Sequence, residues 1–346
     1  MNHYLPTDER ILILGRTKLQ NPLPLFWTGS GLEFIADGSE LSLEYETGYD
    51  IFEQWLRVEI DGATVIRMPL EKGRNELVLY RNLSAGTKRH VKILKEMQAL
   101  SQDPAAFFLI HELSSDGDLY PVPPYPYRIE VIGDSLTSGE GLAGAKNEMT
   151  WGSFVHSTEG HYVERLGALL NAEVRHISQG GWGVYISWDK KTECTIPPYY
   201  EKIAGVLTGE NNARLGANDG WDFSSWKADA VLINLGTNDG TGLGLPPTPE
   251  KAAAFEEAVK NFLFMLRRCN PDAYLLWAYG MCGTPMKEYI RAGVEAYQKE
   301  SGDRRASYLF LTPSPAEWLG SRGHPGKQSH ALAAEEIASV LRSVQL

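Results

Sequence analysis

The fold of this chain is decided by the stretch Ile129–Gly141, which reads IEVIGDSLTSGEG. It begins as a short apolar strand with β-branched residues and ends in Gly-Asp-Ser, before a loop of small residues. In an α/β sheet, a serine at the carboxyl end of a strand stands at the rim where such folds bind their ligands. Ser135 is therefore a candidate nucleophile. Taken alone, Gly-Asp-Ser is more typical of an ordinary turn that ends a strand.

After Tyr127, short apolar strands alternate with amphipathic segments. The predicted strands are residues 128–132, 173–177, 230–235, 273–278 and 307–311. The predicted helices carry apolar residues three and four positions apart and cover residues 162–170, 255–266, 289–297 and 332–344. This alternation is typical of a three-layer α/β/α domain whose five-stranded parallel sheet is covered by helices on both faces. Active-site residues are then expected on the loops that follow the strands.

The N-terminal third has a different pattern, in which short β-forming segments are separated by turn signals. The segments are residues 11–14, 41–45, 56–60, 76–80, 91–94 and 107–110. They predict an all-β sandwich or jelly roll over residues 1–115. Residues 116–126 contain four prolines and are expected to form a stiff linker. The α/β domain then extends over residues 127–346.

Length and charge narrow the class of protein. A chain of 346 residues suits two domains better than one, and a net charge of −11 argues against nucleic acid or an anionic membrane as partner. No basic region followed by an apolar core opens the chain, and no run is long enough to cross a membrane, so we expect a cytoplasmic protein. The cysteines, at positions 194, 269 and 282, are too scattered for a zinc site. We expect no metal and no cofactor.

Three further motifs follow on the predicted loops. Residues 178–183 read SQGGWG, residues 236–239 read GTND, and residues 321–325 read SRGHP. With Gly-Asp-Ser, they resemble the SGNH or GDSL hydrolases, whose four blocks supply a Ser, a Gly, an Asn and a His in this order. Together with the strand-rich N-terminal region and residues 275–283, the chain resembles carbohydrate esterase family 2. Members of that family pair a jelly roll with an SGNH domain and remove acetyl groups from plant-polysaccharide sugars.

The four blocks also have a chemical logic of their own. A serine hydroxyl is a poor nucleophile at neutral pH and needs a base within hydrogen-bond reach, which His324 can provide to Ser135. The oxyanion of the tetrahedral intermediate needs preorganised donors. The available donors are the backbone N–H of Ser135, a backbone N–H of the glycine loop and the side-chain amide of Asn238. The resemblance implies Gly183 as the glycine donor, and Gly181 is a rival register.

One position departs from the family pattern. SGNH hydrolases commonly carry an aspartate three residues before the histidine, whereas this chain has Ser321. Nδ1 of His324 then needs another acceptor, for which a main-chain carbonyl or the Ser321 hydroxyl is available. We therefore expect a Ser-His dyad, as the resemblance implies for some family 2 esterases. Asp134 and Asp239 are expected to stabilise their loops by accepting hydrogen bonds from backbone N–H groups.

Aromatic residues near the loops point to a sugar substrate, because an aromatic ring offers a platform for the apolar face of a sugar. Trp182, inside the glycine loop, is the preferred platform, with a packing role as the competing interpretation. Trp277 is a second candidate, although its place in a predicted strand favours burial equally. The favoured function is a carbohydrate O-acetyl esterase acting on xylan- or mannan-derived acetylated oligosaccharides. The alternatives are a lipid or thioester hydrolase of the same fold and a catalytically inert carbohydrate-binding protein.

Overall fold

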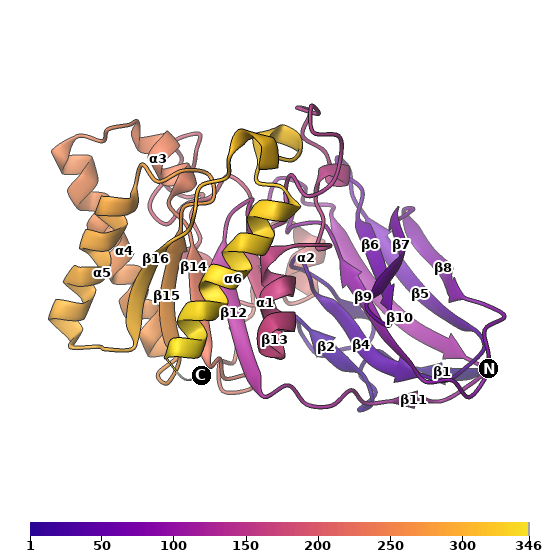
Figure 1. Ribbon diagram of the computed structural model, residues 1–346. Coiled ribbons are helices and arrows are strands. Elements are labelled where there is room, and N and C mark those ends of the chain that lie inside the picture. The colour runs from indigo at the N-terminus through magenta and orange to yellow at the C-terminus, as the bar shows by residue number, and fades with distance from the viewer. Residues whose placement is uncertain (345–346) are drawn as a thin grey trace. The chain divides into compact units, whose positions relative to one another are not determined.

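The computed structural model describes residues 1–344, which form two compact units (Figure 1). The first unit comprises Met1–Pro124, Gly152–Thr158 and Lys202–Gly220, and the second comprises Tyr125–Trp151, Glu159–Glu201 and the chain from Trp221 onwards. The sequence did not indicate that two later segments belong with the N-terminal region. Long-range contacts attach them, such as the 2.8 Å hydrogen bond that Trp27 Nε1 donates to the carbonyl of Ile203.

Two antiparallel sheets form the first unit. One runs in the order β1 (Asn2–Tyr4), β10 (Phe107–Ser115), β5 (Leu41–Gly48), β8 (Gly73–Tyr80), with β3 (Leu23–Pro24) beside β10. The other runs in the order β11 (Leu119–Tyr120), β4 (Gly31–Ala36), β9 (Arg89–Lys95), β6 (Trp55–Ile60), β7 (Ala63–Pro69), with β2 (Leu12–Leu14) beside β4. Leu43, Val58 and Ile110 from these strands are fully buried in one core. The predicted β-sandwich is therefore confirmed.

Two features of this unit differ from the predicted outline. The proline-rich segment 116–126 contains β11, which pairs with β4, so its first part belongs to a sheet and not to a linker. The strands β1, β3, β4 and β7 were missed. A buried glutamate, Glu33, interrupts the apolar run of β4, and β7 is a half-exposed edge strand with little alternation.

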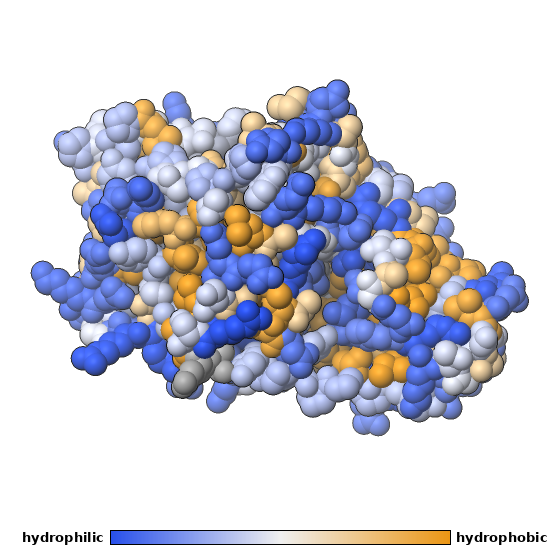
Figure 2. Space-filling model, in the orientation of Figure 1, coloured by the Kyte–Doolittle hydropathy of each residue, from blue (hydrophilic) through white to orange (hydrophobic). Residues whose placement is uncertain are grey.

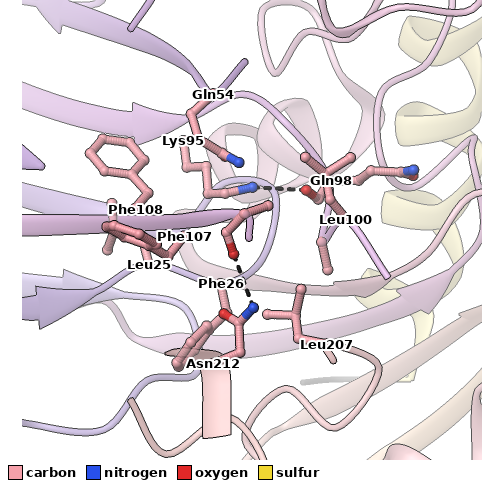
Figure 3. Close-up of a pocket in the computed structure, with 12 residues that line it drawn as sticks. Leu25, Phe26, Gln54, Lys95, Gln98, Leu100, Phe107, Phe108, Leu207 and Asn212 are labelled. Carbon is pink, nitrogen blue, oxygen red and sulfur yellow. Dashed lines mark hydrogen bonds between the residues drawn. The ribbon is translucent and has the colours of Figure 1, made fainter. Parts of the chain in front are cut away.

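The first unit also contains a small pocket, large enough for little more than one water molecule (Figure 3). Lys95 lies 3% exposed at its wall, and its Nζ donates hydrogen bonds to the carbonyls of Met97 and Gln98, the latter at 2.9 Å. Burial lowers the pKa of Lys95 to about 7. The side chain of Asn212 donates to the carbonyl of Ala106 at 3.0 Å across the same pocket. These bonds fix the segment that follows β9.

In the described part of the second unit, five parallel strands form one sheet. Their order is β13 (Ala172–Ser178), β12 (Tyr127–Gly133), β14 (Ala230–Asn234), β15 (Tyr274–Tyr279), β16 (Ala306–Phe310). Each lies within one residue of its predicted span. β14 and β15, which are buried along their whole length, read as nearly continuous apolar runs. The predicted α/β fold is confirmed.

Helices cover both faces of this sheet (Figure 1). α1 (Tyr162–Leu170) and α6 (Lys327–Ser343) pack together over the face that contains Ile129 and Leu276. α4 (Pro249–Cys269) and α5 (Lys287–Ser301) pack together on the other side, where Phe262 contacts Trp277 edge to face at 6.5 Å. Adjacent strand residues point to opposite faces, so Leu276 and Trp277 enter different layers.

Sequence signals at the helix ends explain where these helices begin and stop. Thr248 caps α4 by accepting a hydrogen bond from the backbone N–H of Lys251, and Pro249 occupies the first helical position. α1 ends at Asn171, which adopts a left-handed conformation with φ 51°. Two short helices had no such signals and were missed, namely α2 (Glu210–Arg214) and the glycine-containing α3 (Thr237–Leu243).

The topology creates a crevice at the end of β12. The chain passes from β12 to β13 on one side and later returns to β14 on the other, so the loops that follow these strands diverge at the rim of the sheet. Ligands of open α/β sheets bind at such switch points. Hydrophobic residues on the visible face form small separate patches among hydrophilic ones (Figure 2). No helix within residues 1–344 combines the length and the apolar character that a membrane span requires.

Candidate active site

The structure brings Ser135 and His324 into direct contact at this rim. Ser135 follows β12 by two residues, and His324 follows a short 3₁₀ turn, η4 (Ser321–Gly323). Nε2 of His324 lies 3.0 Å from Oγ of Ser135, which is hydrogen-bond distance. Gly141 permits this approach, because a Cβ at that position would lie 2.5 Å from Cβ of His324. Two residues 189 positions apart in sequence thus meet at the distance that a nucleophile and its base require.

The backbone determines how the imidazole is oriented. Nδ1 of His324 lies 3.2 Å from the carbonyl oxygen of Arg322. A carbonyl can only accept, so Nδ1 carries the proton and Nε2 is left to accept one from the Ser135 hydroxyl. Of the two acceptors that the sequence left open, the structure uses the carbonyl. The Ser321 hydroxyl instead donates to the carbonyl of Ala143 at 2.6 Å.

Arg322 reaches this position through an uncommon backbone conformation. Its φ of 58° and ψ of 18° are left-handed, a region that residues other than glycine rarely adopt. The backbone N–H of Arg322 donates to the carbonyl of Glu148 at 2.7 Å, and its Nη1 donates to the carbonyl of Met149 at 2.7 Å. These bonds hold the strained turn in place.

Glu140 is a further residue near the base that the sequence did not single out. Its side chain is 4% exposed, and Oε1 accepts a hydrogen bond from Nε of Arg322 at 2.7 Å. The same oxygen lies 3.7 Å from Nε2 of His324. The backbone N–H of Glu140 donates to the carbonyl of Ser135 at 3.0 Å. The residue follows Gly139 in the nucleophile block, and this closeness in sequence to Ser135 is the signal that was available.

Asn238 lies in the first turn of α3, on the opposite side of the crevice. Its Nδ2 donates to Oδ2 of Asp134 at 3.0 Å and to the carbonyl of Trp182 at 3.0 Å. An amide has two N–H bonds, and both are used here. An oxyanion at this site would therefore take over one of the two hydrogen bonds. The contact with Trp182 also ties the amide to the peptide unit that contains the N–H of Gly183.

The glycine loop is held by Asp239. Its carboxylate accepts hydrogen bonds from the backbone N–H groups of Val184, Tyr185 and Ile186 at 3.1, 2.8 and 3.0 Å. A Cβ on Gly183 would lie 2.2 Å from the carbonyl oxygen of Ile186 and 2.5 Å from the Asp239 carboxylate, so the close packing requires glycine. This loop stays compact because one buried acid satisfies three consecutive donors.

The rival register at Gly181 has a different environment. Its φ of 81° is left-handed, and its carbonyl accepts a hydrogen bond from the backbone N–H of Trp188 at 3.0 Å. It thus joins the glycine loop to the segment that carries Trp188. Gly183 stays the proposed donor, as the resemblance implies.

Asp134 and Asp239 behave as loop anchors, as expected from the sequence. Asp134 accepts a hydrogen bond from the backbone N–H of Leu136 at 3.0 Å. Burial raises the pKa of Asp134 to about 7, and the charges of Asp239 and Glu140 act in the same direction. Burial raises the pKa of Asp239 to about 6, against the opposing effect of its three backbone donors. The hydrogen bonds of both carboxylates connect loop segments to one another.

The tryptophan predictions need correction. Trp277 is fully buried, and its Nε1 donates to the carbonyl of Leu235 at 3.0 Å, so it is a core residue of β15. Trp182 is only 9% exposed and packs against Tyr199 at 5.4 Å, so its ring is not an open platform either. Trp188 is 59% exposed and lies against Gly181, where a Cβ would approach its ring to 2.8 Å. The three tryptophans differ in the exposed fraction of their side chains, which the sequence pattern does not reveal.

Comparisons with known proteins agree with this geometry. Residues 131–332 match the GDSL-like Lipase/Acylhydrolase family, and residues 13–123 match the carbohydrate esterase 2 N-terminal domain. The chain belongs to the GDSL-like lipase/acylhydrolase family. Within that family it is close to the acetyl xylan esterases of carbohydrate esterase family 2.

Individual relatives cover nearly the whole chain. An acetyl xylan esterase structure from the rumen bacterium Butyrivibrio proteoclasticus is 36% identical, covers 99% of this chain and 98% of that chain, and superposes with a TM-score of 0.96. The acetylxylan esterase/glucomannan deacetylase of Cellvibrio japonicus is 25% identical over 98% of this chain and 90% of its own length. A family two carbohydrate esterase from Clostridium thermocellum, solved with cellohexaose, has the same fold with a TM-score of 0.84 and 24% identity, over 96% of this chain and 98% of that one.

No metal centre accompanies this site in the described chain. Within residues 1–344, no three His, Cys, Asp or Glu side chains are grouped so that they could hold a metal ion.

Proposed function

We propose that the chain is a carbohydrate O-acetyl esterase that acts on acetylated oligosaccharides derived from xylan or mannan. The observation that carries the proposal is the 3.0 Å contact between Oγ of Ser135 and Nε2 of His324 at the rim of the parallel sheet. The relatives, an acetyl xylan esterase and an acetylxylan esterase/glucomannan deacetylase, support this class of ester and of sugar.

Acylation begins when Oγ of Ser135 attacks the carbonyl carbon of the acetyl group. The hydroxyl proton passes to Nε2 of His324, and the proton on Nδ1 stays there, hydrogen-bonded to the carbonyl of Arg322. The tetrahedral intermediate collapses when the bond from the acetyl carbon to the sugar oxygen breaks. His324 gives its Nε2 proton to that oxygen, and the sugar leaves with a free hydroxyl.

Deacylation repeats the sequence with water. His324 takes a proton from the water molecule as its oxygen attacks the acetyl carbon of acetyl-Ser135. The second tetrahedral intermediate collapses when the bond to Oγ of Ser135 breaks. The proton returns from His324 to Oγ, and acetate is released.

Hydrogen bonds of the folded protein hold the groups that we assign to the oxyanion hole. Asn238 and the 182–183 peptide are bonded to each other, and Asp239 holds the loop that follows. When the oxyanion forms, it replaces one of the two present acceptors of the Asn238 amide, which are the Asp134 carboxyl and the Trp182 carbonyl. It also accepts hydrogen bonds from the backbone N–H groups of Ser135 and Gly183. Because the glycine loop and Asn238 are held in advance, the reaction needs the exchange of this one hydrogen bond of Asn238 and no movement of the loop.

We assign sugar contact to Trp188. Its ring is 59% exposed beside the glycine loop, whereas Trp182 and Trp277 are buried. An exposed ring beside the oxyanion donors can stack on the apolar face of a pyranose while the acetyl group enters the site. This assignment favours sugar esters over esters of long acyl chains, because an exposed ring beside the site does not enclose an acyl chain.

Two measurements test the proposal. The first is acetate release from acetylated xylo- and manno-oligosaccharides, compared with hydrolysis of acetyl and octanoyl aryl esters. We expect acetyl esters to be preferred, and a preference for octanoyl esters would instead favour a lipid or thioester hydrolase. The second is labelling by a serine-directed fluorophosphonate.

The labelling experiment has a matched control in the same loop. We expect label on the wild-type protein and on Ser138→Ala, and none on Ser135→Ala. Ser138 is fully buried, and its Oγ bonds Oγ of Ser178 at 3.0 Å, away from the base. A wild-type protein that takes up no label and releases no acetate would favour a catalytically inert carbohydrate-binding protein.

A further inference from the structure

Glu140 stands between two basic side chains. Its Oε1 accepts from Nε of Arg322 at 2.7 Å and lies 3.7 Å from Nε2 of His324, and its side chain is 4% exposed. Arg322 carries a permanent charge, whereas His324 becomes charged only when it takes the proton of Ser135. One buried carboxylate therefore faces a fixed cation and a transient one.

We propose that Glu140, held in place by Arg322, stabilises the charged form of His324 during acyl transfer and so performs the electrostatic task of the acid that Ser321 replaces. The inference rests on the proposed esterase function. In a Ser-His-Asp triad the acid sits at Nδ1, where it both orients the ring and stabilises its charge. Here the two tasks are divided. The carbonyl of Arg322 orients the ring at Nδ1, and the carboxylate of Glu140 provides the charge on the Nε2 side.

The contacts of Glu140 define this role more closely. Its backbone N–H bonds the carbonyl of Ser135 at 3.0 Å, so the residue that faces the base is also fixed to the nucleophile. Its carboxylate is directed by the guanidinium, whose other end is fixed to the carbonyl of Met149. His324 stays the base, because its Nε2 is the atom in contact with Oγ of Ser135. Oε1 of Glu140 accepts a hydrogen bond from Arg322 and stabilises the charge of His324 without contacting Ser135.

Other titratable groups near the base do not provide the same charge. Burial lowers the pKa of His330, on α6, to about 3, so it is neutral at working pH. Desolvation raises the pKa of Cys282, on the loop after β15, to about 12, so its thiol is neutral as well. Asp134 is bonded to the Asn238 amide on the oxyanion side. The carboxylate that lies 3.7 Å from Nε2 of His324 is that of Glu140, paired with Arg322, whereas Asp134, with a pKa of about 7, changes its charge on the oxyanion side in wild type and variants alike.

Two substitutions with opposite expected effects test the proposal. The measurement is the pH profile of kcat/KM on an acetyl aryl ester, whose acid limb reports protonation of the base. Glu140→Gln removes the negative charge and leaves Arg322 facing the imidazole, so the acid limb should move to lower pH by about one unit. Arg322→Met leaves Glu140 uncompensated, so the limb should move to higher pH. The double variant should return toward the wild-type profile.

Glu148→Gln is the matched control. It removes a carboxylate eight positions away that bonds the backbone N–H of Thr150 at 2.6 Å, and the net charge changes by the same amount. Its acid limb should stay at the wild-type position. Arg322→Met keeps the orienting carbonyl and the backbone bond to Glu148 but loses the side-chain bond to Met149, so the plateau value of kcat/KM is the check that the turn still orients His324.

The outcomes separate this inference from the proposed function. Acid limbs of Glu140→Gln and Arg322→Met that coincide with wild type, or move in the same direction, would overturn the inference while leaving the esterase intact. Loss of acetyl ester hydrolysis in the wild type itself would instead remove the proposed function. If Glu140→Gln does not fold by circular dichroism, the upward shift in Arg322→Met decides the matter alone.

Discussion

The two sides of the crevice use carboxylates in different ways. On the side of the base, Glu140 is paired with the guanidinium of Arg322 and faces the imidazole. On the oxyanion side, Asp134 and Asp239 bind amide N–H groups, and burial raises the pKa of both. The first side must accommodate a charge that appears and disappears within one turnover. The second must hold donors still. An ion pair suits the former task, and backbone hydrogen bonds suit the latter.

The largest effect is expected at the nucleophile, for which no other group on either side of the crevice can substitute. Ser135→Ala removes the atom that bonds the acetyl carbon, so kcat on an acetyl ester should fall by about 10⁴-fold or more. Acetate release checks this, with Ser138→Ala as the control that leaves the base contact untouched. Retention of more than about half of the activity in Ser135→Ala would remove the nucleophile assignment.

Asn238→Ala probes the oxyanion side. Loss of one donor should lower kcat by about 10²- to 10³-fold with a much smaller change in KM, because the missing bond matters most for the charged intermediate. Steady-state kinetics on an acetyl aryl ester measures the split. Thr241→Ala, an exposed position on α3, serves as the control. A change confined to KM would mean that Asn238 contacts the ground-state ester instead.

The buried acids predict a particular dependence of stability on pH. The pKa of Asp134 is raised from 3.8 to about 7 in the folded protein, so the folded state keeps a proton that the unfolded chain releases. The resulting contribution to stability is complete below about pH 3.8 and is lost as the pH rises toward 7. In urea unfolding, Asp134→Asn should therefore gain stability relative to wild type, by up to about 1.4 kcal/mol per pH unit over this window.

An exposed acid provides the comparison for that experiment. Asp222→Asn should show the opposite slope, because hydrogen bonds from Ser224 lower the pKa of that carboxyl. Should Asp134→Asn lose stability relative to wild type as the pH rises, the buried carboxyl would be ionised and stabilising, and the contrast between the two sides would weaken.

The smallest effect is expected at the sugar contact. Trp188→Ala should raise KM for acetylated oligosaccharides by about 5- to 10-fold and leave KM for a small aryl acetate nearly unchanged, because only the sugar reaches the ring. Trp188→Phe keeps an aromatic surface and should recover most of the loss. Equal losses on both substrates would assign Trp188 to the support of Gly181 and not to sugar contact.

The sequence predicted the α/β half of the fold well because its signals are local. The run 128–132 was found as β12 (Tyr127–Gly133), and the loops after parallel strands must meet at one rim. For the same reason Ser135 and His324 could be paired from motifs alone. The contact itself became visible only in the structure.

What escaped prediction depends on tertiary contacts. The ion pair of Glu140 and Arg322 joins residues 182 positions apart and requires a left-handed conformation at Arg322, which the motif SRGHP does not predict. The choice of Trp277 failed because strands of a parallel sheet are buried on both faces, so a large ring there belongs to the core. The segments 152–158 and 202–220 joined the first unit through contacts such as that of Trp27, which leave no periodic trace in the sequence.

The acceptor that orients His324 is a main-chain oxygen, and this limits how the enzyme can be altered. Every amino acid carries that oxygen, so no side-chain exchange at position 322 can delete it, and glycine would adopt the φ of 58° with the least strain. Substitutions of the side chains around His324 can therefore change the charge near its imidazole, while the main-chain acceptor that selects its tautomer is kept as long as the turn keeps its conformation.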